Sequence, residues 1–187
     1  NGKKVAVVGA GPGGLACGYY LSLLGFSTTV YEEMPKAGGW LRYGIPEYRL
    51  PKDVLDKEIE LLTQTGMQIH CNQKIGENYT LAQLEHDYDA VCLAIGASLA
   101  VSSPYPGSEL AGCYLGVDYL KDAATERKLK TGKRVAIIGG GNTAIDCART
   151  ALRLGAKVTL IYRRTMAEMP AEEYEIEIGR ASCRERV

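Results

Sequence analysis

Short apolar runs alternate along the chain with longer segments that have apolar residues at helical spacing. Residues 4–8 (KVAVV) are almost wholly apolar, which is typical of a parallel strand buried on both faces. Residues 13–24 then carry small and large apolar positions at helical spacing, and Gly25 follows as a C-terminal cap. The β-rich run STTVYEE, residues 27–33, predicts a second strand. The pattern therefore predicts a strand, a glycine turn, a helix and a strand.

The next part of the chain is less regular. Residues 35–51 carry Gly and Pro at turn positions, and a helix is expected over residues 51–65. MQIHC (67–71) and DAVCLAIG (89–96) predict two further strands. SSPYPGSELAG, residues 102–112, holds two Pro and two Gly in eleven residues, so it is the best candidate for a linker.

A second cycle repeats the first at a constant offset of 130 residues. After a predicted helix at 117–127, RVAIIGGG predicts a strand and turn, residues 142–154 a helix, and KVTLIYRR a strand. Gly9 corresponds to Gly139 and Gly11 to Gly141. Two matched βαβ units indicate an α/β fold with two Rossmann-like dinucleotide-binding domains.

The first turn has the spacing G-x-G-x-x-G, formed by Gly9, Gly11 and Gly14. The first glycine permits a tight turn, the second lets the backbone approach a pyrophosphate, and the third permits close packing of helix on strand. The helix N-terminus offers N–H groups and partial positive charge to phosphates. Glu32 follows 18 residues after Gly14, where a carboxylate accepts hydrogen bonds from ribose hydroxyls and repels a 2'-phosphate.

The second turn has the variant spacing G-x-G-x-x-A, formed by Gly139, Gly141 and Ala144. Here the strand runs into Arg163 and Arg164, whereas the first unit ends on glutamates. Guanidinium groups pair bidentately with phosphate, so this unit should prefer NADPH. The alternative is that both arginines are solvated surface charges. Two dinucleotides in one chain imply electron transfer between them.

Composition excludes several other classes of function. Lys+Arg and Asp+Glu both total 22 in 187 residues, so no net charge favours a nucleic acid or an anionic membrane. No apolar run approaches the roughly 18 residues of a membrane helix, and a cytoplasmic setting is expected. The six cysteines are never closer than 21 residues, so there is no C-x-x-C and no metal site is predicted.

Three long stretches resemble a known family. VAVVGAGPGGLACGYYLSLLGFSTTVYEE, AGGWLRYGIPEYRLPKDVLDKEIELL and GKRVAIIGGGNTAIDCARTALRLGAKVTLIYRRTMAEMPA are similar to the FAD- and NADPH-binding half of the glutamate synthase small subunit group. That group includes the flavin part of dihydropyrimidine dehydrogenase and the large subunit of an NADH-dependent ferredoxin:NADP oxidoreductase. The resemblance covers residues 3–177, and GIPEYRLPK and YRRTMAEMPA are its most specific strings.

The resemblance implies an FAD domain with an inserted NADPH domain, and hydride transfer from the nicotinamide to the flavin. It implies that the cofactor-binding residues at the first site are Gly9, Gly11, Pro12, Gly14, Glu32, Gly39, Trp40, Arg49 and Ile75. At the second site it implies Gly139, Gly141, Asn142, Thr143, Arg163 and Arg164. Trp40 and Ile95 depart from the pattern, since the family has a smaller aliphatic residue and Thr there. No catalytic residue is expected, because the flavin itself carries out the redox step.

The expected organisation is an incomplete FAD-binding segment at 1–103 and an incomplete NAD(P)H-binding segment at 104–177. Residues 178–187 are expected to be a non-native tail, because helical periodicity stops there and Arg, Ser and Cys crowd together. The family's FAD domain is completed by a later segment, so we expect a truncated fragment that is inactive and binds FAD weakly or not at all. The resemblance also implies an iron-sulfur domain or subunit as partner, for example a glutamate synthase large subunit.

Other readings remain open. Dihydropyrimidine dehydrogenase and ferredoxin:NADP oxidoreductase flavin subunits are the alternatives within the group. A disulfide reductase is disfavoured by the absence of C-x-x-C, and a flavin monooxygenase because YGIPEYRLPK does not resemble its signature. Outside the enzymes, the alternative is a non-catalytic module that senses NADPH. In such a module Glu32 and the YGIPEYRLP segment would have no role.

Overall fold

The computed structural model describes residues 2–101, 105–125 and 131–182. The chain forms two compact units, Asn1–Ser98 and Leu99–Val187. The division falls a few residues before the expected boundary at residue 103, and the start of the expected linker, at residues 102–104, lies outside the described residues.

The first unit is built on a four-stranded parallel sheet with the order β3-β2-β1-β4. Its strands are β1 (Lys4–Val8), β2 (Ser27–Tyr31), β3 (Gln68–His70) and β4 (Ala90–Leu93). β1 lies inside the sheet, where Val7 is paired with Val30 on one side and with Cys92 on the other. This position explains why residues 5–8 are buried and almost wholly apolar.

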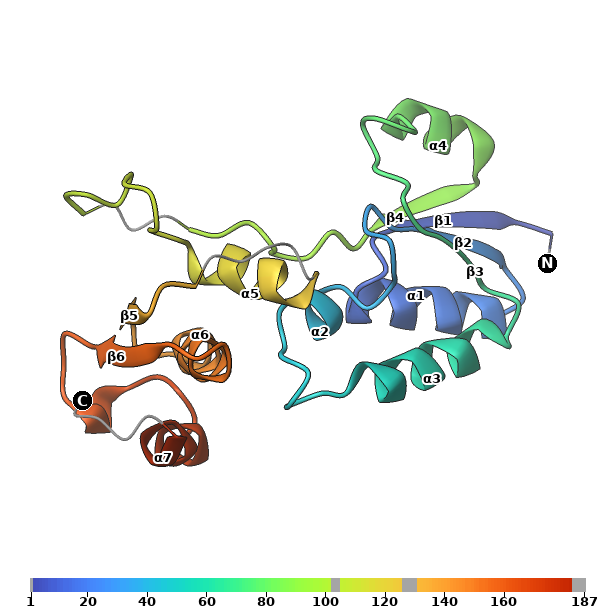
Figure 1. Ribbon diagram of the computed structural model, residues 1–187. Coiled ribbons are helices and arrows are strands. Elements are labelled where there is room, and N and C mark those ends of the chain that lie inside the picture. The colour runs from blue at the N-terminus through green and yellow to red at the C-terminus, as the bar shows by residue number, and fades with distance from the viewer. Residues whose placement is uncertain (1, 102–104, 126–130, 183–187) are drawn as a thin grey trace. The chain divides into compact units, whose positions relative to one another are not determined.

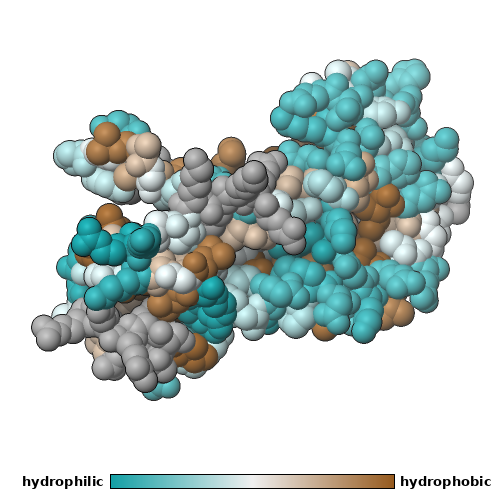
Figure 2. Space-filling model, viewed as in Figure 1, coloured by the Kyte–Doolittle hydropathy of each residue, from teal (hydrophilic) through white to brown (hydrophobic). Residues whose placement is uncertain are grey.

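Helices cover both faces of this sheet (Figure 1). α1 (Pro12–Leu23) and α3 (Lys52–Thr63) pack on one face, over a core that includes Val7, Val30 and Met67. α4 (Leu81–Asp87) packs on the other, where Leu84 is fully buried against Ala6 and Val8. The outer surfaces of α3 and α4 are largely hydrophilic in the view of Figure 2. The predicted α/β fold with a parallel sheet is confirmed for this unit.

The second unit is smaller and has a two-stranded parallel sheet. Its elements are α5 (Gly116–Ala124), β5 (Arg134–Ile138), α6 (Asn142–Arg153), β6 (Lys157–Ile161), the 3-10 turn η1 (Met166–Glu168) and α7 (Glu173–Ser182). α6 packs between the sheet and α5, with Tyr119, Cys147 and Val158 in the core. None of the helices in the described parts of the chain is long and apolar enough to cross a membrane.

The repeat predicted from the sequence is present in the structure. β1, α1 and β2 have the same lengths as β5, α6 and β6, and each pair is offset by 130 residues. Gly9 N donates to Tyr31 O at 2.7 Å, and Gly139 N donates to Ile161 O at 2.9 Å. Gly25 and Gly155 end the two helices with φ values of +84° and +87°, as expected for glycine caps.

Three helices were not expected. α2 (Trp40–Tyr43) lies within the segment predicted to be irregular, and α4 was missed although Thr80 and Gln83 form a capping box at its start. The third is α7, which continues to Ser182 although the sequence was expected to lose its helical periodicity near residue 178. Residues 183–187 lie outside the described residues, and whether 178–187 is a native sequence stays untested.

Candidate functional site

The first glycine turn connects β1 to α1 and leaves no room for side chains. Gly9 has φ +102°, and a Cβ built on it would lie 2.4 Å from the carbonyl oxygen of Ala94 at the end of β4. A Cβ built on Gly14 would lie 1.8 Å from the carbonyl oxygen of Gly9. Gly14 therefore lets α1 pack directly on the turn, which is the role predicted for the third glycine of the motif.

The start of α1 presents backbone amides that the helix does not use. Gly11 is the extended N-cap residue, Pro12 opens the helix, and the i−4 bond of Leu15 N to Gly11 O is 2.9 Å long. The N–H groups of Gly13 and Gly14 precede that bond, so they are available to an anion at the helix N-terminus. A Cβ built on Gly13 would meet no atom within 4 Å, so the space beside the turn is open. This cradle fits a pyrophosphate.

Glu32 follows β2 and is fixed against the turn. Its side chain is buried, with the residue 5% exposed. Oε2 accepts a hydrogen bond from Ala10 N and Oε1 accepts one from Met34 N, each at 2.8 Å. Each carboxylate oxygen has a second lone pair. Glu32 can therefore hold the turn and still accept hydrogen bonds from the hydroxyls of a sugar.

Gly38 and Gly39 approach the same turn from the following loop. Gly38 N donates to Ala10 O at 2.8 Å, and a Cβ built on Gly39 would lie 2.6 Å from the Cα of Gly11. Gly39 also has φ +52°, in the left-handed region that favours glycine. The structure thus brings Gly39 together with the glycine turn, as expected of one site.

Other residues predicted for the first site lie in its surroundings. The indole of Trp40 packs on Gly44, where a built Cβ would lie 1.9 Å from the ring. Arg49 lies half-buried in the loop between α2 and α3. Ile75 packs against the core around Tyr31 and Leu84. The structure assigns these three residues places in the first unit, and their contacts with a flavin stay predictions.

Ionisable groups near the first turn are affected by burial. Burial raises the pKa of the Tyr43 hydroxyl, which both accepts from Lys36 N and donates to Lys36 O at 3.1 Å. Burial also raises the pKa of the Cys71 thiol, and the nearby charge of Glu32 adds to the effect. Both groups are therefore neutral at pH 7, so neither supplies a nucleophilic anion. Among the described residues no group of three His, Cys, Asp or Glu side chains is placed to hold a metal ion.

The second glycine turn connects β5 to α6 with similar geometry. Gly139 has φ +140°, and a Cβ built on it would lie 3.3 Å from the Cβ of Ala144. Gly141 is the extended N-cap residue of α6. Asn142 opens the helix, and its Oδ1 accepts from Glu172 N at 3.1 Å, so it also ties the turn to the segment before α7. Thr143 is exposed beside it.

The two turns differ most at the residue that follows the second strand. Tyr162 occupies the position of Glu32, and its ring lies on Gly140, where a built Cβ would be 2.8 Å from the ring. The hydroxyl of Tyr162 donates to Glu168 O at 3.0 Å. Arg163 and Arg164 follow and are exposed. The second turn therefore has no carboxylate at this place and has two accessible guanidinium groups next to it.

The contact of Tyr162 with Gly140 was not predicted. The sequence did hold a signal for it, because Ala10 in the first repeat corresponds to Gly140 in the second. The second repeat therefore has a smaller residue, Gly140, in the turn and a larger one, Tyr162, after the second strand. This pairing indicates that the tyrosine ring occupies the volume that the missing methyl group leaves.

Fold and turns together define a protein of the dinucleotide-binding α/β class, with two glycine-turn units in one chain. The chain belongs to the pyridine nucleotide-disulphide oxidoreductase family, whose model matches residues 3–180.

Comparison with individual proteins confirms the resemblance found in the sequence. The chain is 47% identical to the NADP(+)-dependent formate dehydrogenase subunit beta of Moorella thermoacetica, over 94% of this chain and 26% of that protein. It is 41% identical to the NAD-dependent dihydropyrimidine dehydrogenase subunit PreT of Salmonella typhimurium, over 92% of this chain and 42% of the relative. It is 37% identical to the glutamate synthase [NADPH] small chain of Escherichia coli, over 96% of this chain and 41% of that protein.

The fold is also similar to that of a solved oxidoreductase. Mycobacterium tuberculosis FprA in complex with NADPH matches with a TM-score of 0.77 at 23% identity, over 94% of this chain and 46% of that one. The chain spans between about a quarter and less than half of the length of these proteins.

Proposed function

We propose that this chain is the nucleotide-binding part of an FAD-dependent NADPH oxidoreductase of the cytoplasm. The observation that carries the proposal is the pair of matched glycine turns with different side chains after the second strand. A buried carboxylate, Glu32, adjoins the first turn, whereas Arg163 and Arg164 follow the second. The first is suited to a plain ribose and the second to a ribose that carries a 2'-phosphate.

In the first unit, the proposed ligand is FAD. The amides at the start of α1 bind its pyrophosphate, since Gly9, Gly11 and Gly14 let the backbone approach closely. Glu32 accepts hydrogen bonds from the ribose hydroxyls with the lone pairs that Ala10 N and Met34 N leave. Bound flavin would supply the hydride-accepting chemistry, and the residues of the chain orient it.

In the second unit, the proposed ligand is NADPH. Gly139, Gly141 and the start of α6 bind the pyrophosphate, with Asn142 and Thr143 beside it. Arg163 and Arg164 pair with the 2'-phosphate through charge-assisted hydrogen bonds. The names of the relatives include both NADP- and NAD-dependent enzymes, so the arginine pair supports the choice of NADPH here.

Bound flavin would pass its electrons on to a partner. The names of the relatives describe a beta subunit, a subunit and a small chain, which supports a partner subunit for this protein too. We propose an iron-sulfur domain or subunit as the acceptor, in an enzyme similar to glutamate synthase. The flavin subunit of a dihydropyrimidine dehydrogenase or of a ferredoxin:NADP oxidoreductase is the alternative. The family's name also includes disulphide chemistry, but the cysteines here are at least 21 residues apart.

A visible absorption spectrum of the purified full-length protein tests this proposal. We expect a bound-flavin spectrum that bleaches when NADPH is added without oxygen. A module that only senses NADPH would bind the nucleotide and show no flavin spectrum. That result would contradict the proposed oxidoreductase function and favour the NADPH-sensing module.

A further inference from the structure

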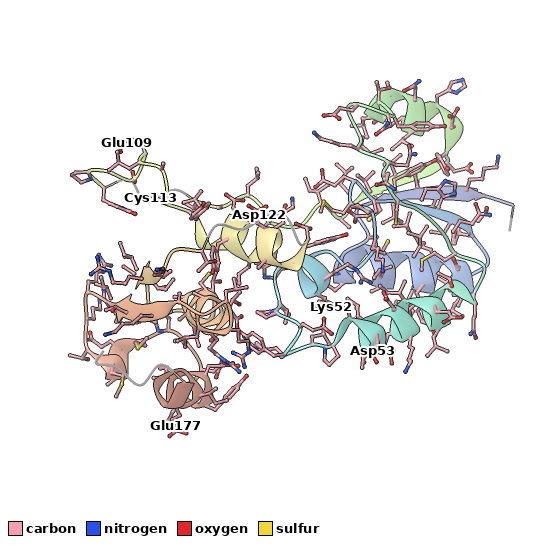
Figure 3. The ribbon with its side chains drawn as sticks, viewed as in Figure 1. Lys52, Asp53, Glu109, Cys113, Asp122 and Glu177 are labelled. Atoms are coloured by element: carbon pink, nitrogen blue, oxygen red, sulfur yellow. The ribbon has the colours of Figure 1, made fainter. Side chains whose placement is uncertain are left out.

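The loop between α2 and α3 converges on one ammonium group. Lys52 is the first residue of α3, and its Nζ donates to the carbonyl oxygens of Leu41 at 3.1 Å, Ile45 at 2.8 Å and Leu50 at 2.7 Å. Figure 3 labels Lys52 beside α2. An ammonium has three donors, so each donor of Lys52 is matched by one carbonyl oxygen, that of Leu41 in α2 or those of Ile45 and Leu50 in the loop.

The N-terminal end of α3 is an unfavourable place for the ammonium group of Lys52. The N-terminus of a helix carries partial positive charge, and partial burial lowers the pKa of Lys52. Glu47 opposes both effects, since its charge raises that pKa and its carboxylate oxygens accept from the backbone N of Lys52 at 3.1 and 3.2 Å. The carbonyl oxygens replace the water that the ammonium has lost.

α3 holds α2 at a second point as well. Arg42 is buried, its Nε donates to Ala37 O at 2.5 Å, and its guanidinium forms an ion pair with Asp56 of α3. The four-residue helix α2 is too short to be stable by itself. Its position therefore depends on these contacts from α3.

Movement of α2 would reach the first glycine turn directly. Gly39 is the N-cap residue of α2, and it touches the Cα of Gly11, while Gly38 N is bonded to Ala10 O. The chain of contacts runs from Lys52 through the carbonyls of α2 and its loop to Gly39, and from there to the turn.

We propose that Lys52 is a positioning residue for the flavin site: it fixes α2 and the loop at residues 44–51, and through Gly39 it keeps the first glycine turn in its binding conformation. This inference rests on the proposed binding of FAD at that turn. Lys52 acts through the backbone and touches no reacting atom.

Lys52→Met tests the inference, because methionine keeps most of the length of the side chain and removes all three donors. Lys57→Met, on the exposed surface of the same helix, is the matched control. Both variants are made in the full-length protein, and two quantities are measured: hydrogen exchange of the amides of residues 38–50, and the dissociation constant of FAD. For Lys52→Met we expect faster exchange and about tenfold weaker FAD binding or more, and for Lys57→Met neither.

The visible band of the flavin that still binds should also change shape in Lys52→Met, which a change of overall stability alone would not produce. If Lys52→Met fails to fold, Lys52→Arg replaces it, because a planar guanidinium fits three converging carbonyls less well, and its FAD binding should be weaker than that of the control. FAD binding equal to that of Lys57→Met contradicts the inference alone. A wild-type protein that binds no FAD contradicts the proposed function and this inference with it.

Discussion

Gly13 and Gly14 are neighbours in the first turn of α1, yet a methyl group would meet different surroundings at each. At Gly14 the added Cβ would lie 1.8 Å from Gly9 O, which is a backbone atom that cannot move independently of the turn. At Gly13 no atom lies within 4 Å of it. Gly14 is therefore required for packing, whereas Gly13 is not.

Gly14→Ala is therefore expected to push α1 away from the turn. Overpacking of this kind costs about 1–3 kcal/mol of unfolding free energy, which urea denaturation measures. Gly13→Ala should leave stability unchanged or raise it by about 0.5–1 kcal/mol, because alanine favours the helix. Equal effects of the two substitutions would show that α1 does not rest on Gly9.

Cys147 gives a prediction about pH. It is 3% exposed on α6, its Sγ donates to Gly116 O at 3.5 Å, and burial raises the pKa of its thiol from 9.0 to about 12, with a smaller contribution from Asp146. Above pH 9 the unfolded chain releases this proton and the folded chain keeps it. Stability should therefore fall as the pH rises from about 9 towards about 12.

The unfolding free energy measured by urea at a series of pH values checks this expectation. The wild-type slope should be steeper than that of Cys147→Ala by up to about 1.4 kcal/mol per pH unit. A Cys147→Ala protein with an unchanged slope would mean that the thiol titrates normally.

At the scale of elements, α7 is attached to α6 by a buried ion pair. Arg149 Nη1 and Glu175 Oε2 are 2.8 Å apart, and their side chains are 9% and 3% exposed. Glu175→Gln would remove the negative charge from this buried, charge-assisted hydrogen bond, so we expect a loss of about 1–3 kcal/mol in unfolding free energy. Glu177 points outward from α7 in Figure 3, so Glu177→Gln should have little effect on the unfolding free energy. Equal stabilities of the two variants in thermal unfolding would contradict this role.

The sequence predicted the elements whose own pattern is strong. β1 and β5 are short apolar runs, α1 and α6 follow them after a glycine turn, and the structure confirms all four elements. α2 could not be predicted, because four residues carry no periodicity and their helical conformation depends on contacts with α3. α4 could have been predicted, because Thr80 and Gln83 form a capping box at its start. α7 is held partly by a partner 26 residues away along the chain.

The same distinction applies to the site. The glycine spacing and the acidic residue after β2 were sufficient to predict Gly9, Gly14 and Glu32 at one turn. The role of Lys52 could not be predicted, because its partners are backbone carbonyls, which any residue supplies. Side-chain patterns identify groups that act through side chains, and contacts to the backbone appear only in the folded chain.

For the whole molecule, the same βαβ unit occurs twice with different side chains beside the glycine turn. The two units share element lengths, register and turn hydrogen bonds. They differ where the second strand ends, with Glu32 bonded to the first turn and Tyr162 packed on the second. The proposed division of labour between flavin and NADPH follows from this local difference on a common backbone.

Anaerobic reduction of the bound flavin in the full-length protein, followed at increasing concentrations of NADPH and NADH, tests this division most directly. We expect NADPH to act at about 10- to 100-fold lower concentration than NADH, and Arg163→Ala/Arg164→Ala to abolish that preference while the flavin stays bound. Equal reduction by both nucleotides, unchanged in the double variant, would contradict the account of the second unit.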